Sequence, residues 1–145
     1  MEITHKGNTL KIIRGIYNFN SVKEDTALTI GSFDGVHLGH QMVLNDLKAA
    51  ALKRGLKSAV MIFEPQPQEY FSGEKAPARL MRLRDKLKTF CDSGIDIVVC
   101  LRFDDSLRNL TADAFISIII NGLYAKHLII GDDFRFGCDR SGDFK

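Results

Sequence analysis

Two histidines three residues apart, His37 and His40, follow a glycine-punctuated turn and are the side chains best suited to do chemistry in this sequence. At positions i and i+3 of a helix, the two imidazoles lie on one face and can both donate hydrogen bonds to phosphate oxygens. Donors placed in this way also stabilise negative charge as it grows in a transition state. The spacing therefore predicts a catalytic pair that acts on a phosphate group.

The turn before the histidines, with the sequence GSFDG at 31–35, has the features of a phosphate-binding loop. We expect Gly31 and Gly35 to take backbone conformations closed to other residues and to let a phosphate approach main-chain N–H groups. A helix that begins near His37 adds unpaired first-turn amides and the positive end of its dipole. The alternative is a strand–turn–helix connection with two surface histidines. The predicted phosphate-binding residues are Gly31, Ser32, Phe33, Asp34, Gly35, His37, Gly39 and His40.

The composition is that of one globular domain: 145 residues, 45% hydrophobic and 26% charged. The net charge is only +2 and basic residues are interspersed with acidic ones, so we expect no nucleic-acid partner. No run approaches the roughly 20 apolar residues of a membrane span, which favours a cytoplasmic protein without a membrane partner. Cys91, Cys100 and Cys138 form no CxxC pair, which argues against a disulfide framework or a zinc site.

Hydrophobic runs alternate with amphipathic segments along most of the chain. Strands are expected at 27–30, 58–63, 96–101 and 127–130, and helices at 40–54, 80–93 and 111–121. This alternation predicts a parallel sheet with helical crossovers. Each helix is followed by a glycine and an apolar residue, which predicts Schellman stops at Gly55, Gly94 and Gly122. Residues 1–10 are expected to be a loosely held leader, and residues 10–16 an edge strand.

Three motif-like segments follow three of the expected strands. GSFDGVH follows 27–30, EPQP follows 58–63 and GDDFRFG follows 127–130. Ligands of parallel sheets bind beyond the carboxyl ends of the strands. We therefore expect these three segments to converge on one edge of the sheet.

Prolines and aromatic residues make the segment after residue 63 rigid, because each proline fixes its own φ and keeps its predecessor extended. A rigid aromatic segment of this kind can pack against a flat heterocycle. The residues alone, however, favour an ordinary loop whose aromatic rings cover the core. The helix at 80–93 carries many charges beside its apolar stripe, and we interpret most of them as a solvated face. These charges are Arg79, Arg82, Arg84, Lys86 and Lys88.

Asp132 and Asp133 are adjacent acids in the last motif. Such a pair can hold a metal ion, but adjacent acids in a loop are more often solvated or cap a helix. We therefore assign no metal ligand on the protein.

Four motifs occur here together and in one order. GSFDGVHLGH, FEPQP at 63–67, ARL at 78–80 and GDDFRFG at 131–137 resemble the adenylyltransferase module of bacterial bifunctional riboflavin kinase/FAD synthetases. The resemblance covers nearly the whole chain. It implies an α/β fold of the nucleotidyltransferase type, a Rossmann-like doubly wound parallel sheet with helices on both faces, which is C-terminally incomplete here.

The resemblance also implies a reaction: ATP and FMN give FAD and pyrophosphate by direct in-line transfer of AMP to the FMN phosphate, with Mg²⁺ accompanying ATP. The loop and both histidines would bind ATP. Gln66 stands where many relatives have histidine, which puts a titrating role there in doubt, and Met81 replaces the usual threonine of an RLT-type motif. The flavin-binding residues implied are Pro65, Gln66, Pro67, Phe71, Arg79, Asp133 and Phe136.

The family's SSTxxR-like motif and its riboflavin kinase barrel are absent from these 145 residues. We therefore expect 1–145 to be a truncated FMN adenylyltransferase domain, with the kinase domain in cis in the full-length protein. Two alternatives stay open: an HxGH transferase for another phosphorylated acceptor, and a fragment that binds nucleotide or flavin without turnover. The absence of GxGxxG disfavours a dehydrogenase module, and the absence of a KMSKS-like segment disfavours an aminoacyl-tRNA synthetase.

Overall fold

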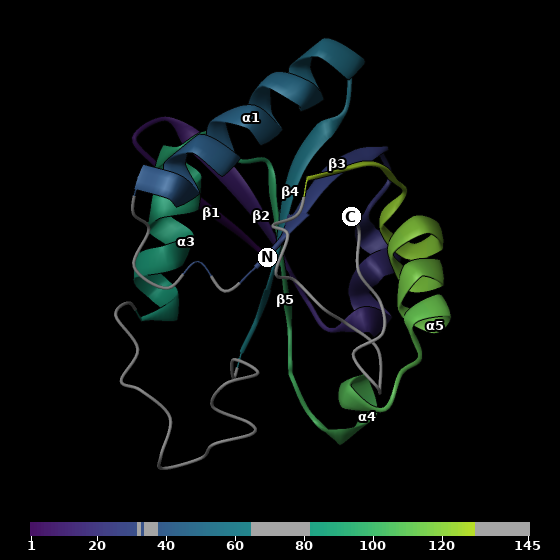
Figure 1. Ribbon diagram of the computed structural model, residues 1–145. Helices are drawn as coiled ribbons and strands as arrows, with labels where there is room; N and C mark the ends of the chain where they lie inside the picture. Colours follow the sequence, from purple (N-terminus) through teal and green to yellow (C-terminus); the bar gives the residue numbers. More distant parts are fainter. Residues whose placement is uncertain (32, 34–37, 65–81, 130–145) are drawn as a thin grey trace.

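The computed structural model describes residues 1–31, 33, 38–64 and 82–129 (Figure 1). In this part of the chain, six strands form one sheet in the order β1-β2-β5-β4-β3-β6. Neighbouring strands are parallel except in the β1–β2 hairpin, so the predicted parallel sheet is confirmed. The strands are β1 (Glu2–His5), β2 (Asn8–Arg14), β3 (Thr26–Ile30), β4 (Lys57–Phe63), β5 (Ile97–Leu101) and β6 (Ala125–Ile129).

Helices cover both faces of the sheet (Figure 1). On one face, α1 and α3 pack through side chains such as Leu44 and Phe90, and on the other face Phe19 and Phe115 come from η1 and α5. Strands covered on both sides need continuous apolar runs, which is why β3 and β5 are buried at every position. The helices are η1 (Ile16–Ser21), α1 (Leu38–Arg54), α3 (Leu83–Asp92), α4 (Asp105–Arg108), α5 (Ala112–Ser117) and η3 (Ile118–Gly122). The doubly wound, Rossmann-like architecture is confirmed.

The order of the strands reverses at β3. The chain moves from β3 to β4 and β5 on one side, and then crosses back to β6 on the other side of β3. A reversal of this kind opens a crevice beyond the carboxyl ends of the strands. The ends of β4, β3 and β6, to which the three predicted motifs attach, are direct neighbours. The predicted convergence of these strand ends is therefore confirmed.

The prediction of a loose leader at residues 1–10 is wrong. β1 and β2 form an antiparallel hairpin, and β2 lies inside the sheet between β1 and β5. Lys6 and Gly7, with φ of 52° and 81°, form the two-residue turn that such hairpins favour. Most residues of β1 are only partly covered, so this edge strand carries little of the apolar signal that marks the buried strands.

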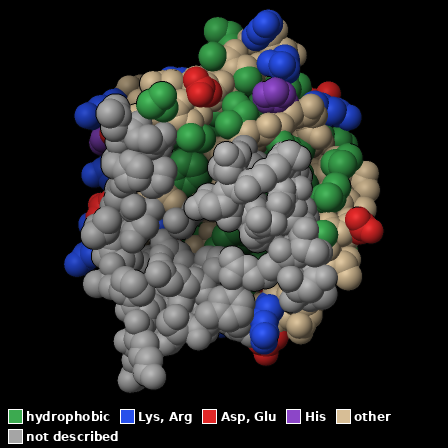
Figure 2. Space-filling view, viewed as in Figure 1, with side chains coloured by type: hydrophobic (Ala, Val, Ile, Leu, Met, Phe, Trp, Pro, Cys, Tyr) green, Lys and Arg blue, Asp and Glu red, His purple; other side chains and the backbone are tan. Residues whose placement is uncertain are grey.

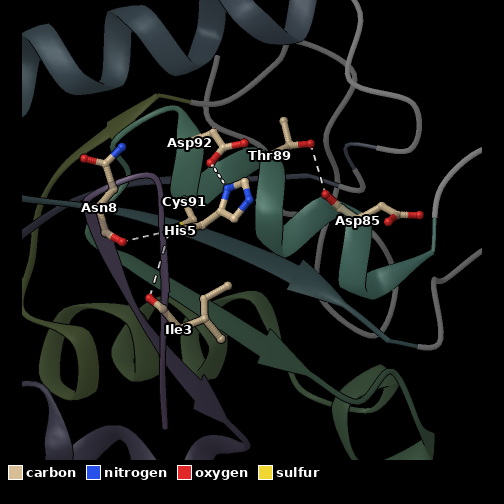
Figure 3. A network of polar contacts seen from close by, with 7 residues as sticks. All are labelled: Ile3, His5, Asn8, Asp85, Thr89, Cys91 and Asp92. Atoms are coloured by element: carbon tan, nitrogen blue, oxygen red, sulfur yellow. Dashed lines mark hydrogen bonds and ion pairs between the residues drawn. The ribbon is translucent and has the colours of Figure 1, made fainter.

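Side chains of α3 fasten this hairpin to the domain (Figure 3). His5 of β1 forms an ion pair with Asp92 at the end of α3. The Cys91 thiol donates to the backbone oxygen of Asn8 at 3.3 Å, which ties β2 to the same helix. The N-terminal hairpin is thus held by polar contacts whose two partners are 83 or more residues apart in sequence.

Two of the three predicted Schellman stops are present. Gly55 and Gly94 have φ of 67° and 81°, which a side chain would disfavour. Leu56 N–H donates to the Ala51 oxygen at 2.8 Å, the 6→1 bond of this motif. The equivalent bond after α3 joins Ile95 to the Phe90 oxygen at 3.1 Å.

The stop predicted at Gly122 is wrong. The helix expected at 111–121 is α5 followed by the π-helical turn η3, and the positive φ falls on Tyr124 at 51°. A Cβ on Gly122 would lie 2.7 Å from Cδ2 of Phe19. Glycine is therefore required here because η3 packs closely against η1. Thr111 caps the start of α5, since its hydroxyl accepts from Ala114 N–H at 3.1 Å.

Candidate active site

Gly31 joins the end of β3 to the predicted phosphate loop. Its N–H donates to the Met61 oxygen at 3.1 Å, which extends the pairing with β4 and commits this donor to the sheet. Its φ is not positive, contrary to the prediction. A Cβ at this position would lie 3.0 Å from Cε2 of Phe33. The glycine is thus required by the close approach of an aromatic ring.

Phe33 anchors the loop in the core. Its side chain is 4% exposed, and its ring meets that of Phe90 on α3 edge to face, with centroids 5.5 Å apart and planes at 85°. Its φ of 52° is unusual for a bulky residue and costs on the order of 1 kcal/mol or more. Only the backbone of Phe33 is therefore placed for a ligand, since its side chain belongs to the core.

The helix that carries the second histidine starts close to β3. α1 has 17 residues and begins at Leu38, so Gly39 and His40 stand in its first turn. That turn contains no acidic residue, so no carboxylate there competes with an anion for the first amides. The backbone thus places His40 at a helix N-terminus beside the strand reversal.

The other predicted site residues lie outside the described residues. In the phosphate loop and the histidine pair these are Ser32, Asp34, Gly35 and His37. In the flavin-binding set they are Pro65, Gln66, Pro67, Phe71, Arg79, Asp133 and Phe136.

Sequence reasoning missed Lys86. We expected it on a solvated face, and its side chain is 0% exposed, whereas Arg82, Arg84 and Lys88 of the same segment are exposed. Helix periodicity could have indicated this burial, because Lys86 stands three residues after Leu83 and four before Phe90, inside the apolar stripe of α3.

The charged residues that act on Cys100 show near which strand end Lys86 lies. Burial raises the pKa of the Cys100 thiol; the charges of Arg14 and Lys86 act in the opposite direction, and Glu64 adds to the rise. These three charged residues therefore lie around the carboxyl end of β5, from the end of β2 to the residue after β4.

The described residues form neither a metal cluster nor a membrane-spanning helix. No group of three His, Cys, Asp or Glu side chains in this part is arranged to hold a metal ion. None of the helices described here is long and apolar enough to cross a bilayer. On the face shown in Figure 2, basic and acidic side chains are scattered, in keeping with the net charge of +2.

A depression of about 350 Å³ lies at the amino ends of the strands, opposite the candidate site. It has both signs of charge on its walls, and Lys57 pairs there with Glu24 at 3.8 Å. Ligands of parallel α/β sheets bind at the opposite edge, beyond the carboxyl ends of the strands, so this depression is not the candidate site.

Together, the described elements define a doubly wound α/β domain in which the helix that carries His40 follows β3, the strand at which the strand order reverses. A solved structure with this fold is that of a macrolide-efflux protein from Streptococcus pneumoniae, with a TM-score of 0.76 and 25% identity. That match covers 90% of this chain and 44% of the solved one.

The family model described as FAD synthetase matches residues 19–145. The chain belongs to this family. The bifunctional riboflavin kinase/FMN adenylyltransferase of Escherichia coli K12 is 51% identical over 137 residues, and that of Haemophilus influenzae 50% over 136. The match covers 93% of this chain in both cases, and the chain spans only 44% of the length of these curated relatives.

Proposed function

We propose that this chain is an FMN adenylyltransferase module that makes FAD and pyrophosphate from FMN and MgATP. The observation that carries the proposal is the meeting of β4, β3 and β6 at one edge, with His40 in the first turn of the helix that follows β3. Membership of the FAD synthetase family supports the choice of substrates.

In the proposed reaction, an oxygen of the FMN phosphate attacks the α-phosphorus of ATP in line. A new P–O bond forms, the bond to the bridging oxygen of the β-phosphate breaks, and pyrophosphate leaves with that electron pair. No covalent enzyme intermediate is needed, because positioning and electrostatic stabilisation do most of the work in such transfers. His37 and His40 donate hydrogen bonds to the oxygens on which charge grows.

The loop at 31–35 binds the ATP phosphates in this proposal, through its backbone. The N–H of Gly31 is already bonded to the Met61 oxygen, so Gly31 contributes only the space left by its missing side chain. Phe33 contributes its main chain, because its side chain is buried. Mg²⁺ enters with ATP and neutralises part of the phosphate charge. The flavin side is assigned to Pro65, Gln66, Pro67, Phe71, Arg79, Asp133 and Phe136 from the family resemblance.

We also infer that residues 1–145 are one module of a longer protein with a riboflavin kinase domain in cis. The relatives are named as bifunctional, and the chain spans 44% of their length. The module alone should therefore bind its substrates weakly and turn over poorly.

The test is transfer of label from [α-³²P]ATP into FAD, followed by chromatography after incubation with FMN and Mg²⁺. The complete gene product and the 145-residue chain should be assayed side by side. Labelled FAD from the complete product is expected, with less from the shorter chain. Transfer only to a different phosphorylated acceptor would overturn the choice of FMN, and flavin binding without labelled FAD in either sample would reduce the function to binding.

A further inference from the structure

Phe33 has a backbone conformation that bulky residues rarely adopt, and the proposed function gives its side chain no role. Among the described residues other than glycine, φ is positive at Lys6, Phe33 and Tyr124. Lys6 and Tyr124 are exposed, whereas Phe33 is buried and stands in the segment after β3 that is assigned to ATP. Strained residues persist only where their surroundings hold them, and they are concentrated at ligand-binding sites.

A glycine would adopt the φ of 52° at position 33 without strain. The same chain uses glycine in this way at Gly55 and Gly94, whose φ values are 67° and 81°. Position 33 instead carries a large side chain that its backbone conformation disfavours. The side chain must therefore contribute something that offsets the strain.

The ring of Phe33 contacts two fixed parts of the fold. It meets the ring of Phe90 on α3 edge to face, with 5.5 Å between centroids. It also lies close to the main chain of Gly31, where a Cβ would be only 3.0 Å from Cε2 of the ring. Gly31 is itself fixed, because its N–H donates to the Met61 oxygen of β4 at 3.1 Å. The ring is thus held by α3 and by the extension of the β3–β4 pairing.

The core cluster around Phe33 also includes α1. Leu44 and Leu47 belong to this cluster, and they lie on the helix whose first turn carries His40. The anchored ring therefore fixes the main chain of Phe33 relative to α1 as well as α3. A ligand that binds a main chain already held in place avoids the entropy loss of ordering it.

We propose that Phe33 is a positioning residue, whose buried ring holds its own main chain in the conformation that meets the ATP phosphates. This inference rests on the part of the proposed function that assigns the main chain of Phe33 to ATP. Without the ring, the backbone relaxes toward other values of φ, and ATP binds a conformation that is only partly populated. The apparent affinity for ATP then falls with the population of that conformation. FMN is assigned to other segments and keeps its affinity.

The experiment measures steady-state FAD formation by the complete gene product with Phe33→Gly or Phe33→Leu. Glycine accepts the φ of position 33 but supplies no anchor, whereas leucine supplies a smaller apolar one. Phe33→Gly should raise KM for ATP about tenfold, the order expected for ordering the backbone of one residue, and leave KM for FMN within about twofold. Phe33→Leu should change KM for ATP in the same direction but by less.

Phe19→Leu is the matched control. Phe19 is 4% exposed, as Phe33 is, but it belongs to the core cluster on the other face of the sheet. This variant should lower the melting temperature, because it removes a buried ring, and should change KM for ATP by no more than about twofold.

Titration with α,β-methylene-ATP, which cannot be cleaved at the bond that the reaction breaks, measures binding without turnover. Its Kd should rise in Phe33→Gly by the same factor as KM for ATP. A wild-type KM for ATP in Phe33→Gly, or an equal rise in KM for ATP and for FMN, would show that the ring serves the fold alone. Either result overturns this inference and leaves the proposed function standing.

Thermal melting checks that each variant folds. If neither Phe33 variant folds, Phe33 is a structural residue and the inference fails. If the wild type makes no FAD, the proposed function is rejected and the Kd of α,β-methylene-ATP alone decides the role of Phe33. A Kd that is equal in the wild type and in Phe33→Gly then rejects the inference as well.

Discussion

The ring of Phe33 meets the ring of Phe90 edge to face, 5.5 Å between centroids, and so joins the residues after β3 to α3 within one core cluster. The φ of 52° at Phe33 is unfavourable for a bulky residue, and the packing of its ring offsets this cost. Loop geometry and core packing are therefore coupled at the site.

A double-mutant cycle should measure this coupling. Phe90→Ala removes a ring that is 0% exposed and should cost about 3–5 kcal/mol in the free energy of unfolding. Phe33→Leu should cost less, and the two changes should show a coupling of about 0.5–1.5 kcal/mol in chemical denaturation. Strictly additive effects would show that the ring contact has no energetic weight of its own.

Replacing either histidine of the motif should remove one donor to the transition state. We expect His40→Ala and His37→Ala each to lower kcat for FAD formation by about 100-fold to 1000-fold, with little change in thermal stability. The double variant should lose less than the product of the single losses if the two act as a unit. His127→Ala, on β6, is the matched control, and an activity of His40→Ala within a few-fold of wild type would remove His40 from this role.

Gly31→Ala should affect the site more than the fold. The added methyl group would lie 3.0 Å from the Phe33 ring and push the loop backbone out of place. We expect a clear loss of kcat/KM for ATP with a change in unfolding free energy below about 2 kcal/mol. The same substitution in a Phe33→Leu background should lose less activity, and equal losses in both backgrounds would exclude the ring contact as the cause.

Gly122→Ala should destabilise the fold instead. A methyl group there would lie 2.7 Å from the ring of Phe19, and the gain in helix propensity is smaller than the resulting strain. The expected net loss is about 1–3 kcal/mol by chemical denaturation. Asn121→Ala, at an exposed neighbouring position, is the control and should change stability little.

The ion pair between His5 and Asp92 should weaken in acid. The hydrogen bond from His5 holds the pKa of Asp92 below its usual value. A carboxyl group whose pKa is lower in the folded state stabilises the fold at pH values above its unfolded pKa, and this contribution is lost as the pH falls through the folded pKa. Part of the decline in melting temperature below about pH 4 should therefore disappear in Asp92→Asn.

Asp46→Asn, at an exposed carboxylate of α1, is the control for that measurement. If both variants follow the wild-type melting curve between about pH 2 and pH 5, the hairpin gains no stability from the ion pair.

The amino-acid sequence by itself determined the buried strands, their alternation with helices and the parallel sheet in which the ends of β4, β3 and β6 are neighbours. Continuous apolar runs such as AVMIF and IVVC, with Gly55 and Gly94 as helix stops, are local signals that need no partner to be interpreted. The HxGH spacing likewise predicts, from helix periodicity alone, that His37 and His40 share one helix face.

Tertiary structure alone decided the rest, because each remaining feature depends on a neighbour that is distant in sequence. The N-terminal hairpin is held by β5 and α3, and Gly122 is required by Phe19. The sequence places Lys86 on the apolar stripe of α3, but only the packing of this helix against the sheet shows that the lysine itself is fully buried. Propensity and periodicity cannot supply such information, since burial of a given side chain is set by what packs against it.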